Sequence, residues 1–410
     1  MSHHNDSYKW YLLALVVLTN MFVIAVPTMG MSVMSKEISN DLGLDLVQLG
    51  IVWGVGALPG IVTSLLGGMI GDKFGPKRVL IVGSLIGGVL GMARGFAFDF
   101  ASITIIIVLL GAITPVVLMN GYKVIGQWFP SHQLGLANGL IAMGMALGFL
   151  LGSFFSATTL SPWLGGWRNV LIAYGVIGAL FCIPWLFSQA ASEKAHPTST
   201  GASIWKPLKH VAGLKNIWLL GLALFGVAGA IQGMLGYLPL YLRDMGWQPL
   251  HADGAPSAFH LVSMTFVLPF SLWSDRLGSR KRLILIANLA IVIGVGLLSF
   301  VSGGIIWAAV LLAGFMRDTF WAMITTMVIE TRNVGPAFAG TATGFVMAFG
   351  SLNSFLAPPI GNSLASLWSG SPFAFWAALS VFGLICLSLV EAGGRSEDVA
   401  VGELIPLKVE

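Results

Sequence analysis

Two neighbouring charges, Arg317 and Asp318, stand inside a long apolar run of this 410-residue chain. Arg317 lies 12 residues past Ile305, near the start of the run, which is about 18 Å along an α-helix. Its planar guanidinium can hold a carboxylate through two hydrogen bonds, so Arg317 is a candidate anchor for a small anion. Asp318 could orient this guanidinium, pair with another group or carry a proton.

Other interpretations of these two charges stay open. Consecutive helical residues point about 100° apart, so we expect Arg317 and Asp318 not to neutralise each other directly, and the sequence does not decide which of them faces a bound molecule. They could form a buried charge pair with a partner on a neighbouring helix. Alternatively, Asp318 alone could serve proton coupling.

The remaining charges in apolar runs lie nearer to the ends of those runs. Lys123 is 20 residues past Ile103, and Arg94 and Arg168 stand within a few residues of a run end. Long basic side chains in such places can extend to the polar interface, so we expect none of the three at a binding site. His260 can titrate near neutral pH, but a lone histidine is expected to be a structural hydrogen-bond donor.

The composition indicates which solvent surrounds the elements that carry these residues. The chain is 56% hydrophobic and 9% charged, with a mean hydropathy of +0.87, whereas soluble chains carry about 25% charged residues. Lipid is therefore the expected solvent. The chain has only Cys182 and Cys386, no metal-ligand cluster and no phosphate-cradling loop, so we expect no enzyme, cofactor, metal or nucleic acid partner.

Twelve apolar runs are long enough to cross a bilayer, and they begin near Trp10, Val47, Val79, Ile103, Gly135, Trp167, Ile217, Ser257, Leu283, Ile305, Ala337 and Pro372. The longest polar stretch separates the sixth run from the seventh. The sequence predicts an all-α polytopic membrane protein of two pseudo-symmetric six-helix bundles, with these segments: an N-terminal bundle 1–189, a cytoplasmic linker 190–216, a C-terminal bundle 217–392 and a cytoplasmic tail 393–410.

Lysine and arginine are unequally divided between the two ends of these runs. With the N-terminus inside, fifteen fall on the inner face, and the outer face holds only Lys36, Arg94, Arg168 and Arg243. Positive loops favour the cytoplasm, so we expect both termini there and the protein in the plasma (inner) membrane.

One loop occurs twice, at a spacing of 203 residues. Gly-Met-Ile-Gly-Asp-Lys-Phe-Gly-Pro-Lys-Arg ends at Arg78, and the weaker copy, which ends at Arg282, has Ser271 where the first has Gly68. Gly139 and Gly344 match at nearly the same offset. Parallel halves of this kind are typical of transporters.

The loop pattern, its copy and the twelve-run plan together resemble the major facilitator superfamily of secondary transporters, over nearly the whole chain. The resemblance implies alternating access between the two halves and a functional monomer. It implies that Asp72 contacts the positive N-terminal end of span eleven and that Asp275 does the same at span five; the alternative is that the charges only fix topology. The gating residues would be Gly68, Asp72, Lys73, Gly75, Lys77, Arg78, Asp275, Arg276 and Gly278.

The resemblance also implies a cavity lined by spans one, four, seven and ten. Its candidate substrate residues, with Arg317, are Trp321, Asn120, Tyr122, Gln232, Tyr237 and Asn20. Each of them could equally serve packing or a hydrogen bond between helices.

Three short motifs look like those of branches that carry small anions, including carboxylates: Gly-Gln-Trp-Phe-Pro at 126–130, Gly-Leu-Ala-Asn-Gly at 135–139 and Gly-Trp-Arg at 166–168. Span two lacks the arginine expected of nitrate carriers. We therefore expect a transporter of a small organic anion of the carboxylate class that works as a proton symporter, an antiporter or an exchanger. The alternatives are a proton-coupled exporter of amphiphilic or cationic drugs, with Asp318 as its acid, and a non-transporting membrane sensor.

Overall fold

The computed structural model describes residues 3–189, 205–277 and 280–391, and within these residues all regular structure is helical. Nine of the described helical segments are long and apolar enough to cross a membrane. The backbone polar groups of a helix are satisfied within the helix, which is what a span in lipid requires. The predicted all-α polytopic fold is confirmed.

The helices follow the predicted runs, with breaks inside several of them. The first group consists of α1 (His3–Thr19), η1 (Asn20–Ala25), α2 (Val26–Val33), α3 (Ser35–Leu42), α4 (Leu46–Gly54), α5 (Ala57–Phe74), α6 (Pro76–Ala93), η2 (Arg94–Phe96), α7 (Phe100–Trp128), α8 (Ser131–Phe155), η3 (Ser156–Leu160), α9 (Ser161–Leu164), α10 (Trp167–Leu180) and α11 (Cys182–Phe187). The second group consists of α12 (Trp205–Ala212), α13 (Lys215–Asp244), α14 (Pro249–Leu277), α15 (Arg280–Leu297), α16 (Ile305–Gly314), α17 (Arg317–Ile329), α18 (Gly335–Leu364) and α19 (Ser371–Ser388).

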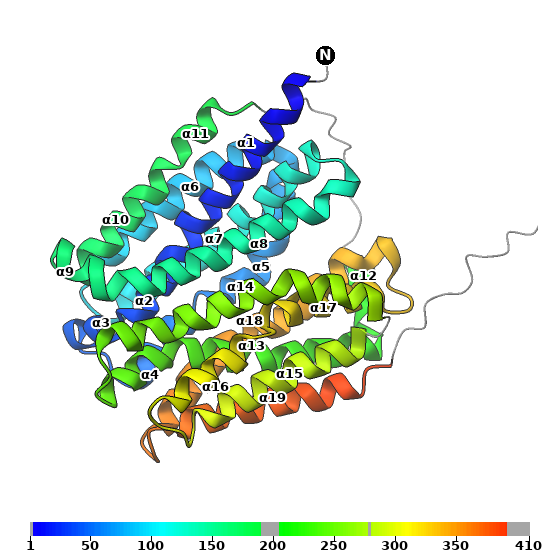
Figure 1. The fold of residues 1–410 in the computed structure, drawn as a ribbon. Helices are drawn as coiled ribbons and strands as arrows, with labels where there is room; N and C mark the ends of the chain where they lie inside the picture. The colour runs from blue at the N-terminus through cyan, green and yellow to red at the C-terminus, as the bar shows by residue number, and fades with distance from the viewer. Residues whose placement is uncertain (1–2, 190–204, 278–279, 392–410) are drawn as a thin grey trace, which may run out of the picture.

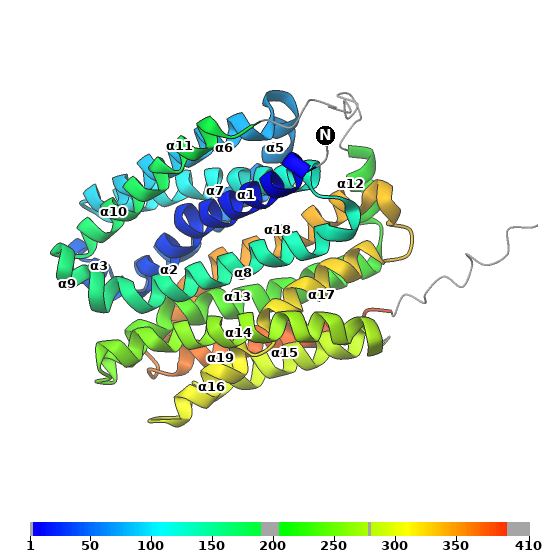
Figure 2. The ribbon, with the colours of Figure 1, turned by 45° about the horizontal axis from the view of Figure 1, so that its top comes forward.

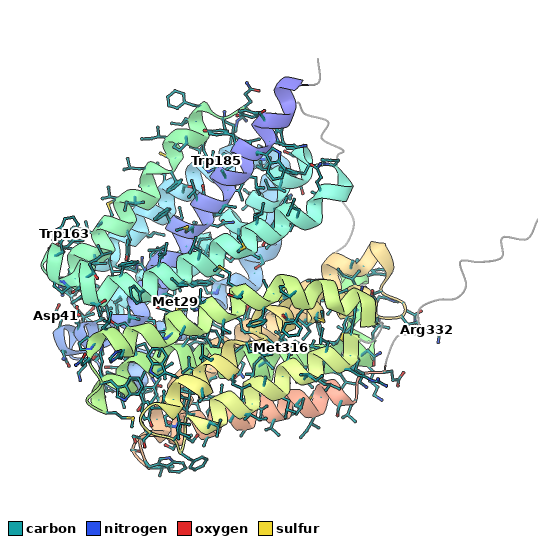
Figure 3. The ribbon with its side chains drawn as sticks, viewed as in Figure 1. Met29, Asp41, Trp163, Trp185, Met316 and Arg332 are labelled. Carbon is teal, nitrogen blue, oxygen red and sulfur yellow. The ribbon has the colours of Figure 1, made fainter. Side chains whose placement is uncertain are left out.

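These groups form two bundles, which Figure 1 shows one above the other, α1–α11 in blue to green and α12–α19 in green to red. Two buried apolar clusters fill the first bundle, and a third runs through the second bundle. Met29 and Leu49 of the first bundle join this third cluster, so the bundles share apolar contact. Figure 3 labels Met29 where the bundles meet. The helix α12 lies in the segment predicted as a linker; the predicted domain boundaries stay predictions.

Several polar contacts hold the bundles together at one end, which carries α3 and the C-terminal end of α13. Lys36 Nζ lies 2.7 Å from Asp244 Oδ1, and Ser32 Oγ donates to the carbonyl of Leu235 (2.7 Å). Nearer the middle, Ser153 and Ser257 bond at 2.7 Å, which joins α8 to α14. Figures 1 and 2 show these two helices side by side. We call the α3 side the closed end.

The internal repeat is visible at the opposite end, where each repeated loop contributes one lysine that bonds to the last span of its own bundle. Lys77 Nζ donates to the carbonyls of Leu186 and Ser188. Lys281 Nζ donates to the carbonyls of Ser388 (2.7 Å) and Val390 (2.6 Å). Lysines commonly satisfy the free carbonyls at helix C-termini. The predicted repeat therefore has a structural counterpart in both bundles.

Candidate functional site

Arg317 is the first residue of α17, directly after a break in span ten. The backbone of Met316 (φ −123°, ψ 17°) interrupts the helix between α16 and α17, and Figure 3 labels this residue inside the second bundle. The Arg317 guanidinium donates to the Asp318 carboxylate and lies over the Trp321 ring, with the guanidinium carbon 5.3 Å from the ring centroid. Trp321 therefore lies beside Arg317, as their spacing of one helical turn requires.

The ion pair corrects the expectation that Arg317 and Asp318 would not neutralise each other directly. They stand in the first turn of α17, directly after the break at Met316, and arginine is long enough to fold back across the angle between neighbouring residues. Both side chains are 20% exposed. The guanidinium Nε is buried without a hydrogen-bond partner in the described part of the chain, so Arg317 keeps a spare donor.

Helix α14 supplies further partners to this pair. Ser263 Oγ donates to Asp318 Oδ2 (2.7 Å) and accepts from the Asp318 backbone N–H (3.1 Å). One turn earlier, His260 is fully buried, and its ring centroid lies 5.0 Å from that of Phe149 in the first bundle. We call His260, Ser263, Arg317, Asp318 and Trp321 the interface cluster.

His260 is not the structural donor that the sequence predicts. Neither ring nitrogen has a hydrogen-bond partner among the described residues. Ser263 was not among the predicted site residues, because nothing in the local sequence pattern indicates that α14 packs against α17. His260 and Ser263 are three residues apart, which places them on one helix face. This spacing was the signal in the sequence that could have linked Ser263 to the site. The interface cluster thus combines a paired carboxylate with unused hydrogen-bonding groups on His260 and Arg317.

The candidate residues of the first bundle have separate surroundings. Asn120 is buried, and its Nδ2 donates to the carbonyls of Gly67 (2.9 Å) and Val116 (2.8 Å), which ties α7 to α5. Tyr122 packs partly buried against the apolar cluster around α1 and α7. Asn20 lies in the π-helical turn η1, and both polar atoms of its buried amide have no partner in the described chain. Among the described residues Asn120 keeps an unpartnered Oδ1, whereas in Asn20 the donor and the acceptor of the amide are both free.

The two candidates on α13 differ in role. The carbonyl of Gln232 accepts from Trp53 Nε1 (2.7 Å), and its side-chain Nε2 donates to the carbonyl of Trp53 (3.4 Å), so Gln232 joins the bundles. Tyr237 is 5% exposed and packs among Tyr241, Phe373 and Trp376. Its surroundings are those of a packing residue.

A cavity of about 300 Å³ lies beside the Trp53–Gln232 contact. Spans one, two and four form most of its wall, with Gln232 and Ser351 from the second bundle. Gln232 is the one predicted substrate residue that lines it. Arg94 also lines it, and the Arg94 side chain donates to the carbonyls of Pro27 and Gly91, both at 3.4 Å.

The burial of Arg94 corrects its expected place at the polar interface, because the residue is only 5% exposed. The short 3₁₀ turn η2 begins at Arg94, and the side chain extends toward span one. Arg168, by contrast, bonds near the surface to Asp41 (2.9 Å). Figure 3 labels Asp41 at the closed end.

A second cavity, of about 380 Å³, lies between α1, α8 and Met264. Its wall contains no charged side chain, so it offers an anion no partner.

The gating motif is folded as a turn, but Asp72 has a different partner from the one expected. Gly75 adopts φ +83°, a conformation that favours glycine. Asp72 Oδ1 lies 2.6 Å from Lys123 Nζ, which also donates to the carbonyl of Gly68. Among the described residues Asp72 makes no contact with span eleven, because the bonds between the bundles lie at the closed end and near the middle. Lys73 lies over the ring of Phe74, with Nζ 5.3 Å from its centroid.

Four other motif positions are less informative. Arg78 is exposed. The side chains of Asp275 and Arg276, and the whole of Gly278, lie outside the described part of the structure.

Comparison with known proteins agrees with this architecture. The family model described as Major Facilitator Superfamily matches residues 11–358 and 255–407. Among solved structures, the nucleoside transporter NupG superposes with a TM-score of 0.70 at 14% identity, over 92% of this chain and 98% of its own. A bacterial homologue of the lysosomal transporter Spinster, inward-facing and unoccupied, gives a TM-score of 0.75 at 16% identity, over 93% and 96%. These two likenesses concern the fold.

Curated relatives match over most of their length. The 3-(3-hydroxy-phenyl)propionate transporter of Escherichia coli strain K12 is 26% identical, over 85% of this chain and 87% of its own. The hexuronate transporter of Bacillus subtilis strain 168 is 23% identical, over 87% and 90%. The gallate transporter of Pseudomonas putida is 22% identical, over 90% and 88%.

Proposed function

This chain belongs to the Major Facilitator Superfamily, and from that premise we propose that it moves a small organic anion, a carboxylate, across its membrane by alternating access. The protein is a membrane transporter rather than an enzyme. The names of three relatives support the substrate class, since hydroxyphenylpropionate, hexuronate and gallate are all carboxylates. No nucleotide hydrolysis is needed, because an ion or substrate gradient can drive such transport.

The observation that carries the proposal is the Arg317 guanidinium beside the interface between the bundles. Its partner Asp318 also accepts from Ser263, and His260 touches Phe149 of the other bundle. An arriving carboxylate would take the place of Asp318 on the guanidinium, because the fork geometry suits any carboxylate. Asp318 would then hold a proton and keep its bond to Ser263. Protonation of Asp318 would thus free Arg317 for the substrate, so that proton and substrate bind together, which couples them as symport.

The alternating movement would open the closed end and bring the Asp72 end together. The contacts to be broken include the Lys36–Asp244 pair, whose side chains are 39% and 56% exposed. Exposed pairs of this kind contribute at most about 1 kcal/mol, so they can be exchanged for new contacts at little cost. Asp72 would leave Lys123 for the N-terminal end of α18, which belongs to span eleven.

The proposal includes the membrane in which the protein lies and the orientation of its two ends. We infer a plasma (inner) membrane transporter with both termini in the cytoplasm, because lysine and arginine concentrate on that side. The closed end would then face outward. We also infer that the monomer is the functional unit and that protons are the coupling ion.

The alternative function is a proton-coupled exporter of amphiphilic or cationic compounds. One observation favours it: the cavity of about 380 Å³ between α1, α8 and Met264 has an almost entirely apolar wall. In that case Asp318 would be the acid that takes a proton from the outside and releases it to the cytoplasm as the compound leaves the cell. The anion carrier is preferred because three of the relatives that match most of the chain are named as transporters of carboxylates.

The test is a binding panel on purified protein, read as a rise in unfolding temperature, since a bound ligand stabilises the folded state. The panel holds 3-hydroxyphenylpropionate, gallate, glucuronate, a neutral sugar and a cationic dye. Wild type, Arg317→Gln and Arg332→Gln are compared, because Arg332 is an exposed arginine just beyond the end of α17. We expect a carboxylate to stabilise wild type and Arg332→Gln only. Stabilisation by the dye that survives in Arg317→Gln would favour the exporter and overturn the anion carrier.

A further inference from the structure

Arg94 is a buried guanidinium that has no carboxylate partner in the described part of the chain. The residue is 5% exposed. Its contacts are the carbonyls of Gly91 and Pro27, both at 3.4 Å, and the sulfur of Met31 at 4.0 Å. A guanidinium has five N–H donors, and these contacts are at the long limit of hydrogen bonding. A buried charge is costly unless it is paired, so Arg94 is suited to a partner that the protein itself does not supply.

The same side chain lines the cavity of about 300 Å³ between the bundles, and it is the charged residue in that wall. The hydroxyls of Thr28, Ser64 and Thr114 also line the cavity, but each donates its proton to its own helix, at 2.6, 2.5 and 2.9 Å. They offer no proton to an anion in this arrangement. Arg94 is therefore the strong donor available there.

The rest of the wall is mostly apolar. It includes the side chains of Val23, Ile24, Pro27, Met31, Val52, Ile107, Leu110 and Pro115. A volume of about 300 Å³ is at the lower end of ligand pockets. Such a wall can hold the compact apolar part of a small ligand. A second charge on that ligand would find no partner in the wall.

We infer that this cavity is a second anion-binding position, at which Arg94 binds the single carboxylate of a small monoanion and the apolar wall holds a body of about one ring. The inference rests on the proposed anion transport and narrows its substrate class to monoanions. An occupant would touch Gln232 and Ser351 as well as the first bundle. It would therefore lie between the two parts that move relative to each other during transport.

The experiment compares ligands that differ only in charge. Benzoate, its neutral amide benzamide and the dianion terephthalate share one ring. Each is titrated into purified wild type, Arg94→Gln, Arg94→Lys and Arg332→Gln, and the rise in unfolding temperature is recorded. We expect benzoate to stabilise wild type and Arg332→Gln, with no response to benzamide and at least a tenfold weaker response to terephthalate. Arg94→Gln should need at least tenfold more benzoate, and Arg94→Lys an intermediate amount.

The possible outcomes test the Arg94 site and the proposed function separately. Benzoate binding that is equal in Arg94→Gln and wild type, or wild type that binds benzamide as well as benzoate, would overturn the Arg94 site. If Arg94→Gln does not fold, Arg94→Lys decides, since it keeps the charge but loses the planar fork. The proposed function is judged separately by the larger carboxylates: if none of them stabilises or is transported by wild type, that proposal fails. If they are transported and Arg94→Gln transports them equally, only the Arg94 inference fails.

Discussion

Lys123 Nζ lies 2.6 Å from Asp72 Oδ1, and both residues belong to the first bundle. The lysine side chain is 29% exposed and the carboxylate 52% exposed. Lys123 also donates to the carbonyl of Gly68, one turn before Asp72 on α5. The lysine thus ties the end of α5, and with it the loop that follows, to α7. It competes with any partner that the second bundle could offer to Asp72.

Replacing Lys123 should therefore move the protein toward the conformation that closes the Asp72 end. In Lys123→Gln the carboxylate loses its partner within the bundle, whereas its proposed partner at α18 is unchanged. Loss of a partly exposed pair should alter the free energy of unfolding by less than about 1 kcal/mol. We expect a shorter distance between spin labels on the two bundles at this end, measured by pulsed electron paramagnetic resonance. An unchanged distance distribution, or a longer one, would contradict the competition.

The Asp318 carboxylate is expected to carry the coupled proton. In Asp318→Asn the side chain cannot ionise, but its oxygen can still accept from Ser263, which now bonds to Asp318 at 2.7 Å. Proton-driven accumulation in proteoliposomes should then be lost, while exchange of internal for external substrate continues. Ser263→Ala is the matched control, since it removes the hydrogen bond and leaves the acid; we expect it to retain accumulation. Accumulation that survives in Asp318→Asn would exclude this residue as the proton carrier.

The length of the apolar runs was sufficient to predict the helical fold. In lipid a backbone must satisfy its own hydrogen bonds, which leaves few alternatives to a helix. The repeated loop likewise predicted a repeated structure, and Lys77 and Lys281 occupy equivalent places in the two bundles. The contact between Arg317 and Trp321 followed from their spacing along one helix.

The tertiary part of the candidate site could not be predicted. The pairing of Ser263 with Asp318 depends on how α14 packs against α17, and no local pattern encodes that. Arg94 was expected at the polar surface of the membrane because it stands near the end of an apolar run. The direction of its side chain is instead set by the turn η2 and by its contacts with span one. The partner of Asp72 depends on which end of the protein is closed. A sequence that serves both conformations does not specify one of them.

The closed end should become accessible to solvent when the charge of one member of its ion pair is reversed. Lys36→Glu places two acidic side chains at positions that now bond at 2.7 Å, and repulsion between them favours separation of the bundles. We expect a cysteine introduced at Ser32, which now bonds to Leu235 across the interface, to react faster with a polar thiol reagent. The double variant Lys36→Glu/Asp244→Lys should restore the slow reaction. Equal reaction rates in all three proteins would show that this pair does not hold the end closed.

The most costly single change is expected at the buried ion pair between Arg243 and Asp253. Arg243 Nη2 lies 2.6 and 2.7 Å from the two carboxylate oxygens of Asp253, and the side chains are 10% and 0% exposed. Removal of one member leaves a buried charge without its partner, which costs about 3 to 5 kcal/mol. The pair joins the end of α13 to the start of α14, away from the interface cluster.

We therefore expect Asp253→Leu to lower the unfolding temperature of the purified protein strongly, with ligand affinity unchanged in whatever fraction remains folded. The double variant Arg243→Met/Asp253→Leu is the control, because a buried pair replaced by apolar groups of similar size is often tolerated. Its unfolding temperature should lie much closer to that of wild type. If the double variant is as unstable as Asp253→Leu, the loss comes from packing or from other contacts of Asp253, and the unpaired arginine is not its cause.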